Sequence, residues 1–104
     1  RLDTPATRYW MRGELPSHDP LIDAPVNPRA VALELQSVYE IPASRVRIRP
    51  VTRGKHDYLL IDVGPFRTAR EAEELRSSGK VKTIRLRNGS PFRFAKVVPE
   101  SADG

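Results

Sequence analysis

The sequence predicts an α+β protein whose elements follow the order strand, helix, strand, strand, helix, strand (βαββαβ), with an extra C-terminal strand. Segments of alternating apolar and polar residues, typical of half-buried strands, are interrupted by two segments with helical periodicity. The chain also nearly repeats itself, because each half has a strand ending in a glycine-containing corner, then a helix, then another strand. We therefore expect a mainly antiparallel sheet with both helices on one face.

The first half is predicted to hold a strand, a proline-rich loop and a helix. The strand covers residues 8–15, in which Gly13 marks a bulge or a close approach of another backbone. Closely spaced prolines indicate a loop over residues 16–28. Asn27 then caps a helix that extends to about Tyr39, because its side chain can accept from the unbonded N–H groups of the first turn. The expected buried face of this helix comprises Val31, Leu35 and Val38.

The stretch from Tyr58 to Ser78 is the best-defined part of the chain and combines a strand, a sharp turn and a short helix. β-forming side chains fill its first part, and Gly64-Pro65 ends the strand. Thr68 and Glu71 have the spacing of a capping box, in which each side chain caps the backbone N–H of the other. The strand and helix are therefore expected to pack as one unit.

Further strands are predicted from alternation and turn signals. Residues 45–51 alternate between arginines and aliphatic residues, and a turn around Gly54 follows. Residues 80–87 are predicted to supply the last strand of the βαββαβ order, with Ile84 and Leu86 opposed by Arg85 and Arg87. Asn88-Gly89 is typical of a two-residue hairpin turn, so residues 92–98 are predicted to return as the extra strand.

Length and composition indicate one domain, placed at residues 8–98 between a lead-in (1–7) and a tail (99–104). The absence of cysteine excludes a disulfide framework, a thiolate zinc site and a cysteine nucleophile. The net charge of +5 favours acidic partners such as nucleic acid, anionic membrane surfaces or cell-wall polymers. No apolar run reaches the length of a membrane span. Because the chain starts with Arg1, we expect a processed form or an excised domain, whose parent could carry a membrane anchor.

Alternation also assigns the side chains of the open face of the sheet, because neighbours along a strand point to opposite faces. The residues expected beneath the helices are Val46, Ile48, Ile61, Val63, Ile84 and Leu86. The candidate binding residues on the other face are Arg47, Arg49, Leu60, Asp62, Arg85 and Arg87, with Tyr58 near an edge. Arginine and aspartate side chains hydrogen-bond polar groups, so this face is either simply solvated or a platform for a polar polymer.

The sequence contains no constellation typical of an enzyme. His18 and His56 lack the spacing of a metal site, and no glycine-rich phosphate loop is present. Ser17, His18 and Asp19 are the residue types of a catalytic triad, but triads are defined by spatial geometry rather than by adjacency. We therefore expect a non-catalytic protein with no cofactor and no bound metal.

A strand ending in Val63-Gly64-Pro65-Phe66 is followed by a helix with Ala69, Ala72 and Leu75 and then by Gly79. This combination resembles the second half of a SPOR domain (sporulation-related repeat). The strand Arg47-Ile48-Arg49-Pro50-Val51 also matches, and the similarity covers roughly Tyr9 to Leu86. The first half departs from the family pattern, because Met11-Arg12-Gly13-Glu14-Leu15 takes the place of the usual Gln-Val-Gly-x-Phe.

The resemblance implies a ferredoxin-like or RNP-like βαββαβ fold and a domain that binds peptidoglycan. SPOR domains prefer glycan strands stripped of stem peptides and help to recruit bacterial proteins to the division septum. It therefore implies a periplasmic or cell-envelope location, with glycan lying across the open sheet face. Met11 stands where the family commonly has a glycan-contacting glutamine, so it joins the candidate binding residues at the margin of that face.

Two other functions stay open from the sequence. A SPOR-like fold could instead bind another protein of an envelope assembly, through Phe92, Phe94 or Leu33 and through strand pairing at the last strand. RNA-recognition modules share the element order and also use the open sheet face. Their central strand, however, carries a basic-Gly-aromatic pattern with alternating aromatics, which the Tyr58–Asp62 stretch lacks.

Overall fold

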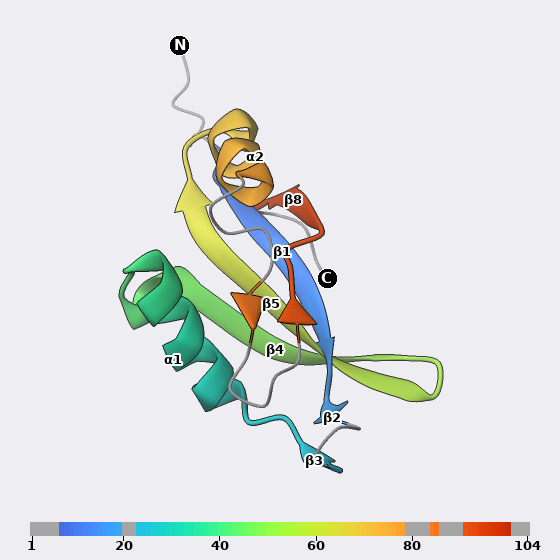
Figure 1. The fold of residues 1–104 in the computed structure, drawn as a ribbon. Helices are drawn as coiled ribbons and strands as arrows, with labels where there is room; N and C mark the ends of the chain where they lie inside the picture. The colour runs from blue at the N-terminus through green and yellow to red at the C-terminus, as the bar shows by residue number, and fades with distance from the viewer. Residues whose placement is uncertain (1–6, 20–22, 79–83, 86–90, 101–104) are drawn as a thin grey trace.

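A four-stranded antiparallel sheet forms the centre of the structure, a computed structural model that describes residues 7–19, 23–78, 84–85 and 91–100 (Figure 1). The strands lie in the order β4-β5-β1-β8, and each neighbouring pair is antiparallel. Their bounds are Val46–Arg53 for β4, His56–Phe66 for β5, Tyr9–Pro16 for β1 and Lys96–Pro99 for β8. The predicted α+β class and the mainly antiparallel sheet are confirmed.

Two α-helices in the described part of the chain cover one face of this sheet (Figure 1). α1 extends over Pro28–Tyr39 and packs against β4, whereas α2 extends over Ala69–Ser77 and packs against β1 and β8. Val31 and Leu35 of α1 share a single buried cluster with Ala72 of α2 and the apolar side of the sheet. Among the described residues, no helix is long and apolar enough to cross a membrane.

Both helices begin at the predicted capping residues. The Asn27 side chain accepts a hydrogen bond from the backbone N–H of Arg29 at 3.0 Å. Thr68 Oγ1 accepts from the N–H of Glu71, also at 3.0 Å. The return bond of a full capping box is shifted by one residue, because the Glu71 carboxylate accepts from the N–H of Arg67 at 3.1 Å. Each cap satisfies a backbone donor that the first turn leaves unpaired.

The register of the strands places apolar residues beneath the helices. Val63 of β5 lies opposite Met11 on one side and Val46 on the other, and Ile61 lies opposite Gly13 and Ile48. The prediction that Val46, Ile48, Ile61 and Val63 face the helices is confirmed. In α1, Val31 and Leu35 are buried, Val38 is partly buried, and Leu33 is 60% exposed.

Gly13 lies where the segment with Phe92 and Arg93 passes close to β1. This is the close backbone approach that was one of the two predictions for this glycine. A Cβ atom at this position would lie 2.6 Å from Phe92 Cζ and 2.7 Å from the backbone oxygen of Arg93. Both distances are shorter than any ordinary contact, and one of them involves backbone. Packing therefore requires the absence of a side chain here.

The C-terminal third differs from the predicted element order. Of the predicted strand 80–87, the structure describes Ile84–Arg85 (β6), which pair with Pro91–Phe92 (β7) in a separate two-stranded sheet. The position beside β1 is taken instead by β8, so the prediction of one continuous strand over residues 92–98 is wrong. Gly79, Leu86, Arg87 and the Asn88-Gly89 turn lie outside the described residues.

Burial of two aromatic rings accounts for this rearrangement. Phe92 and Phe94 are 2% and 5% exposed and belong to the core beneath the helices. Their rings contact each other edge to face at 5.1 Å between centroids. Because both rings must reach the same core, the chain leaves the extended path between β7 and β8.

Two connections contain more structure than predicted. In the proline-rich loop, His18–Asp19 (β2) pair with Ala24–Pro25 (β3). After α1, a short 3-10 helix over Ala43–Arg45 (η1) leads into β4. The predicted tail also begins too early, because Pro99 is the last residue of β8.

Candidate functional site: a pocket on the open face of the sheet

The open face of the sheet carries a row of charged side chains across its three longest strands. The register places Arg12 of β1, Asp62 of β5 and Arg47 of β4 side by side. Leu60 and Arg49 are paired in the next row of the same face. The two-residue period of a strand puts all of these side chains opposite the helices.

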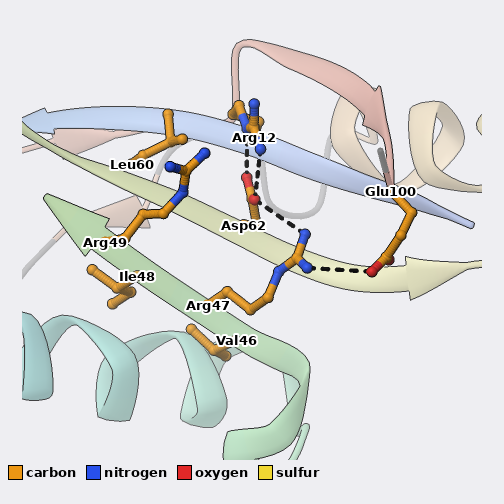
Figure 2. Close-up of a pocket in the computed structure, with 8 residues that line it drawn as sticks. All are labelled: Arg12, Val46, Arg47, Ile48, Arg49, Leu60, Asp62 and Glu100. Atoms are coloured by element: carbon orange, nitrogen blue, oxygen red, sulfur yellow. Dashed lines mark hydrogen bonds and ion pairs between the residues drawn. The ribbon is translucent and has the colours of Figure 1, made fainter. Parts of the chain in front are cut away.

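Asp62 and Arg12 form a buried ion pair at the centre of this row (Figure 2). Arg12 Nε donates to Asp62 Oδ1 at 2.8 Å, and Arg12 Nη2 donates to Oδ2 at 2.9 Å. Arg12 is 5% exposed and Asp62 4%, so neither charge is solvated. Burial of such charges is tolerated because the two-pronged geometry satisfies both groups at once.

Arg47 links this pair to a second acid and to the single tryptophan of the chain. Arg47 Nη2 lies 3.4 Å from Asp62 Oδ2, and Nη1 lies 3.4 Å from Glu100 Oε2. The Arg47 guanidinium also stacks on the Trp10 ring, 3.6 Å from its centroid. The Trp10 indole N–H donates to the other Glu100 oxygen, Oε1. The backbone N–H of Glu100 is held by the carbonyl of Arg8 at 2.7 Å.

A pocket of about 550 Å³ opens beside this network (Figure 2). It is lined by Arg12, Val46, Arg47, Ile48, Arg49, Leu60, Asp62 and Glu100. Arg49 is exposed, and its side chain makes no hydrogen bond or ion pair with the described residues. The side chain of Arg47 is 42% exposed. The donors that a ligand would meet are therefore arginines, on a platform held in place by buried Asp62.

The structure brings together four of the predicted site residues. Arg47, Arg49, Leu60 and Asp62 all line the pocket. Leu60 is 1% exposed and Asp62 has its carboxylate occupied by arginines, so these two shape the pocket rather than offer free groups. Tyr58 lies on the same face beyond Leu60, beside the His56 ring at 6.4 Å, and does not line the pocket.

The other predicted site residues are placed differently. Met11 is fully buried beneath the helices opposite Val63, so its prediction as a ligand contact is wrong. The error comes from the resemblance to SPOR domains. It assigned Met11 the role of the family's glutamine without testing which face of the strand Met11 lies on. Arg85 belongs to β6 and not to the main sheet, and Arg87 lies outside the described residues. Phe92 and Phe94, proposed as protein contacts, are in the core.

Three residues of the site were not predicted: Trp10, Arg12 and Glu100. Arg12 was missed because a lone charged residue in a strand usually faces water. The signal for it was the acid in the middle of β5, which needs a cation opposite it. Glu100 was assigned to the tail, and no local pattern connects it to Trp10, 90 residues away.

The described residues contain no group of three His, Cys, Asp or Glu side chains that could hold a metal ion. Comparison of the chain with models of known protein families, with curated protein sequences and with solved structures finds no match in any of the three. The resemblance to SPOR domains therefore stays a prediction.

Proposed function

We propose that this chain is a non-catalytic SPOR-like domain of a bacterial cell-envelope protein. In this proposal it binds peptidoglycan glycan strands through the open sheet face and targets its parent to the cell wall or septum. The observation that most supports the proposal is the open-face pocket with the accessible arginines Arg47 and Arg49. The location would be the periplasm, and other envelope proteins are possible additional partners.

The chemistry of the pocket suits a polar polymer better than a compact apolar ligand. Arginine presents several N–H donors in a planar fork, which match carboxylates and the oxygen atoms of hydroxyl and N-acetyl groups. Arg47 and Arg49 are two residues apart on β4 and face the same way. A strand rises about 3.3 Å per residue, so the two donors follow one another by roughly 7 Å along the sheet.

We also propose that the fold is a variant of the ferredoxin-like βαββαβ arrangement. In this interpretation β8 serves as its fourth strand, in place of the predicted residues 80–87. Two observations support it: β8 follows α2 in the chain, and it pairs antiparallel with β1 at the edge of the sheet. The β6-β7 pair is then an insertion between α2 and that strand.

The test is a pulldown with purified peptidoglycan sacculi, intact or treated with an amidase that removes stem peptides. Arg47→Ala/Arg49→Ala is compared with Arg29→Ala/Arg70→Ala, which removes the same charge from exposed positions on α1 and α2. Circular dichroism establishes that both variants are folded.

We expect amidase treatment to increase retention and moderate salt to leave it in place. We expect the Arg47/Arg49 variant to bind at least about 10-fold more weakly, since one charged hydrogen bond is worth about 1.5 kcal/mol. The control variant should bind like the wild type. Equal losses in both variants, or binding that disappears in salt, would reduce the effect to nonspecific charge attraction. No retention of the wild type would refute the proposal.

A protein-interaction module is the second candidate. Leu33 is 60% exposed on α1, and β8 lies at an edge of the sheet, where a partner strand could pair. Nucleic acid is less favoured, because RNA-recognition modules stack bases on exposed rings of the sheet face. Here Trp10 is 5% exposed and lies beneath Arg47. Single-stranded RNA is added as a competitor in the pulldown. Displacement of the protein from sacculi by RNA would favour the nucleic-acid alternative.

A further inference from the structure

We infer that Arg47 and the Trp10 indole N–H form a carboxylate-binding site, which the Glu100 side chain occupies until a carboxylate on the ligand replaces it. The inference rests on the proposed function and names the ligand group that the pocket recognises: the free acid of a carboxylate-bearing sugar. Glu100 thus acts as an internal competitor for the same donors.

The geometry around Glu100 is that of a two-donor carboxylate receptor. One oxygen accepts from the Trp10 indole N–H and the other lies 3.4 Å from Arg47 Nη1. The two donors belong to different strands, and the 3.6 Å stacking of Arg47 on the Trp10 ring holds them next to each other. Asp62 binds the other terminal nitrogen of Arg47 at 3.4 Å. The donor pair therefore keeps contacts of its own when Glu100 leaves.

Glu100 is the exchangeable acid of the two that contact Arg47. Its side chain is 48% exposed, whereas that of Asp62 is 5% exposed and is held by two bonds from Arg12. The backbone N–H of Glu100 is hydrogen-bonded to the carbonyl of Arg8, which holds the backbone in place. Glu100 therefore leaves the site by rotation of its side chain. Exposed ion pairs are weak because water solvates the separated charges. A ligand that adds further contacts in the pocket can therefore replace this one.

Under the proposed function, the carboxylate that reaches this site belongs to a sugar acid. The pocket continues from Glu100 along β4 to Arg49, whose side chain has no hydrogen-bond or ion-pair partner among the described residues. Amidase cleavage of a stem peptide converts an amide on the sugar into a free carboxylate. Only the carboxylate form carries the charge that Arg47 recognises, which gives a physical reason for binding to increase after the stem peptide is removed.

The experiment uses the fluorescence of Trp10, the only tryptophan in the sequence. Glu100→Ala and Glu100→Gln are titrated with the disaccharide of N-acetylglucosamine and N-acetylmuramic acid bearing its free carboxylate. Glu74→Gln is the matched control, since it removes one negative charge at an exposed position of α2. Parallel titrations use the same disaccharide with its acid converted to an amide, an uncharged chitin oligomer, and a polyglutamate peptide.

We expect the free acid to bind Glu100→Ala about 2- to 5-fold more tightly than the wild type, the range that an exposed ion pair corresponds to. Glu100→Gln should shift in the same direction, and Glu74→Gln should not. The amide and the chitin oligomer should bind all variants equally and more weakly. Trp10 emission should change in unliganded Glu100→Ala, because the indole N–H loses its acceptor.

Several results would overturn the inference. Unchanged or weaker binding by Glu100→Ala would show that Glu100 does not compete for the site. Equal binding of acid and amide would remove the carboxylate specificity while leaving the proposed glycan binding intact. Tight binding of polyglutamate without sugar binding would assign the site to an acidic protein partner. If no sugar changes Trp10 emission and sacculi are not retained, the proposed function itself fails.

Discussion

Replacing Asp62 by alanine tests whether the centre of the open face is held by a buried ion pair. The change removes the acceptor of two Arg12 hydrogen bonds, at 2.8 and 2.9 Å, and one contact to Arg47. Arg12 is then left 5% exposed with its positive charge deprived of this carboxylate.

The expected loss is large compared with the stability of a small domain. Breaking a buried pair by removing one partner costs about 3–5 kcal/mol. Domains of this size are stable by about 5–15 kcal/mol, so the variant loses from roughly a fifth to all of its stability. With a urea slope of about 2 kcal/mol per molar, the unfolding midpoint should fall by roughly 2 M.

Urea unfolding followed by circular dichroism measures this loss, with Asp57→Ala as the matched control. Asp57 lies on the same strand but is exposed, and it accepts one hydrogen bond from Thr52 at 2.7 Å. Its replacement should cost less than about 1 kcal/mol. The double variant Arg12→Met/Asp62→Leu should be more stable than Asp62→Ala, because it removes both buried charges.

The reasoning fails if Asp62→Ala costs no more than the exposed control. It also fails if the double variant is as unstable as Asp62→Ala, because packing rather than loss of the Arg12–Asp62 ion pair would then be the cause. A change in the urea slope would indicate an altered unfolded or native state and would require a second probe.

Three further predictions concern the core. Burial raises the pKa of Tyr39 to about 12, and its hydroxyl has no partner among the described residues; Tyr39→Phe should therefore stabilise the fold by about 1 kcal/mol at neutral pH in urea unfolding. Because the folded pKa lies above the unfolded value of about 10, the contribution of Tyr39 to stability should be constant below pH 10 and fall as the pH rises through 12. The difference in stability between the wild type and Tyr39→Phe, measured by urea unfolding at these pH values, detects this loss. Gly13→Ala should cost about 1–3 kcal/mol by forcing Phe92 and its backbone away, and a change near zero would contradict the close approach. Leu75→Ala should lower the free energy of unfolding by about 2 kcal/mol, as measured by thermal unfolding. This is the low end of the range for a buried leucine, because the Leu75 side chain is only partly buried against the core.

Signals that act over a few residues account for most of the elements. Asn27 and Thr68 cap the helices because their side chains reach backbone donors two or three residues ahead. Alternation places Arg47 and Arg49 opposite the helices because the two-residue period of a strand depends only on local backbone geometry. The shared open face of Arg47, Arg49, Leu60 and Asp62 could therefore be predicted from the sequence.

Partners distant in the sequence were set by the packing of the whole chain. β1 has apolar residues on both faces, so its pattern could not show that Met11 enters the core while Trp10 lies on the open face. Arg12 meets Asp62 across 50 residues, a contact that depends on the register of β1 against β5. No local pattern encodes a register between strands so far apart.

The choice of the edge strand has the same origin. Residues 80–87 and 96–99 both contain β-forming aliphatic side chains, so the sequence alone did not decide which of them pairs with β1. The position of β8 follows from burying Phe92 and Phe94 beneath the helices, which also brings Glu100 to Trp10 and Arg47. The positions of Arg47 and Arg49 on the open face could thus be predicted from strand periodicity. The contacts of Arg47 with Asp62, Trp10 and Glu100 follow from long-range burial, which depends on all the elements at once.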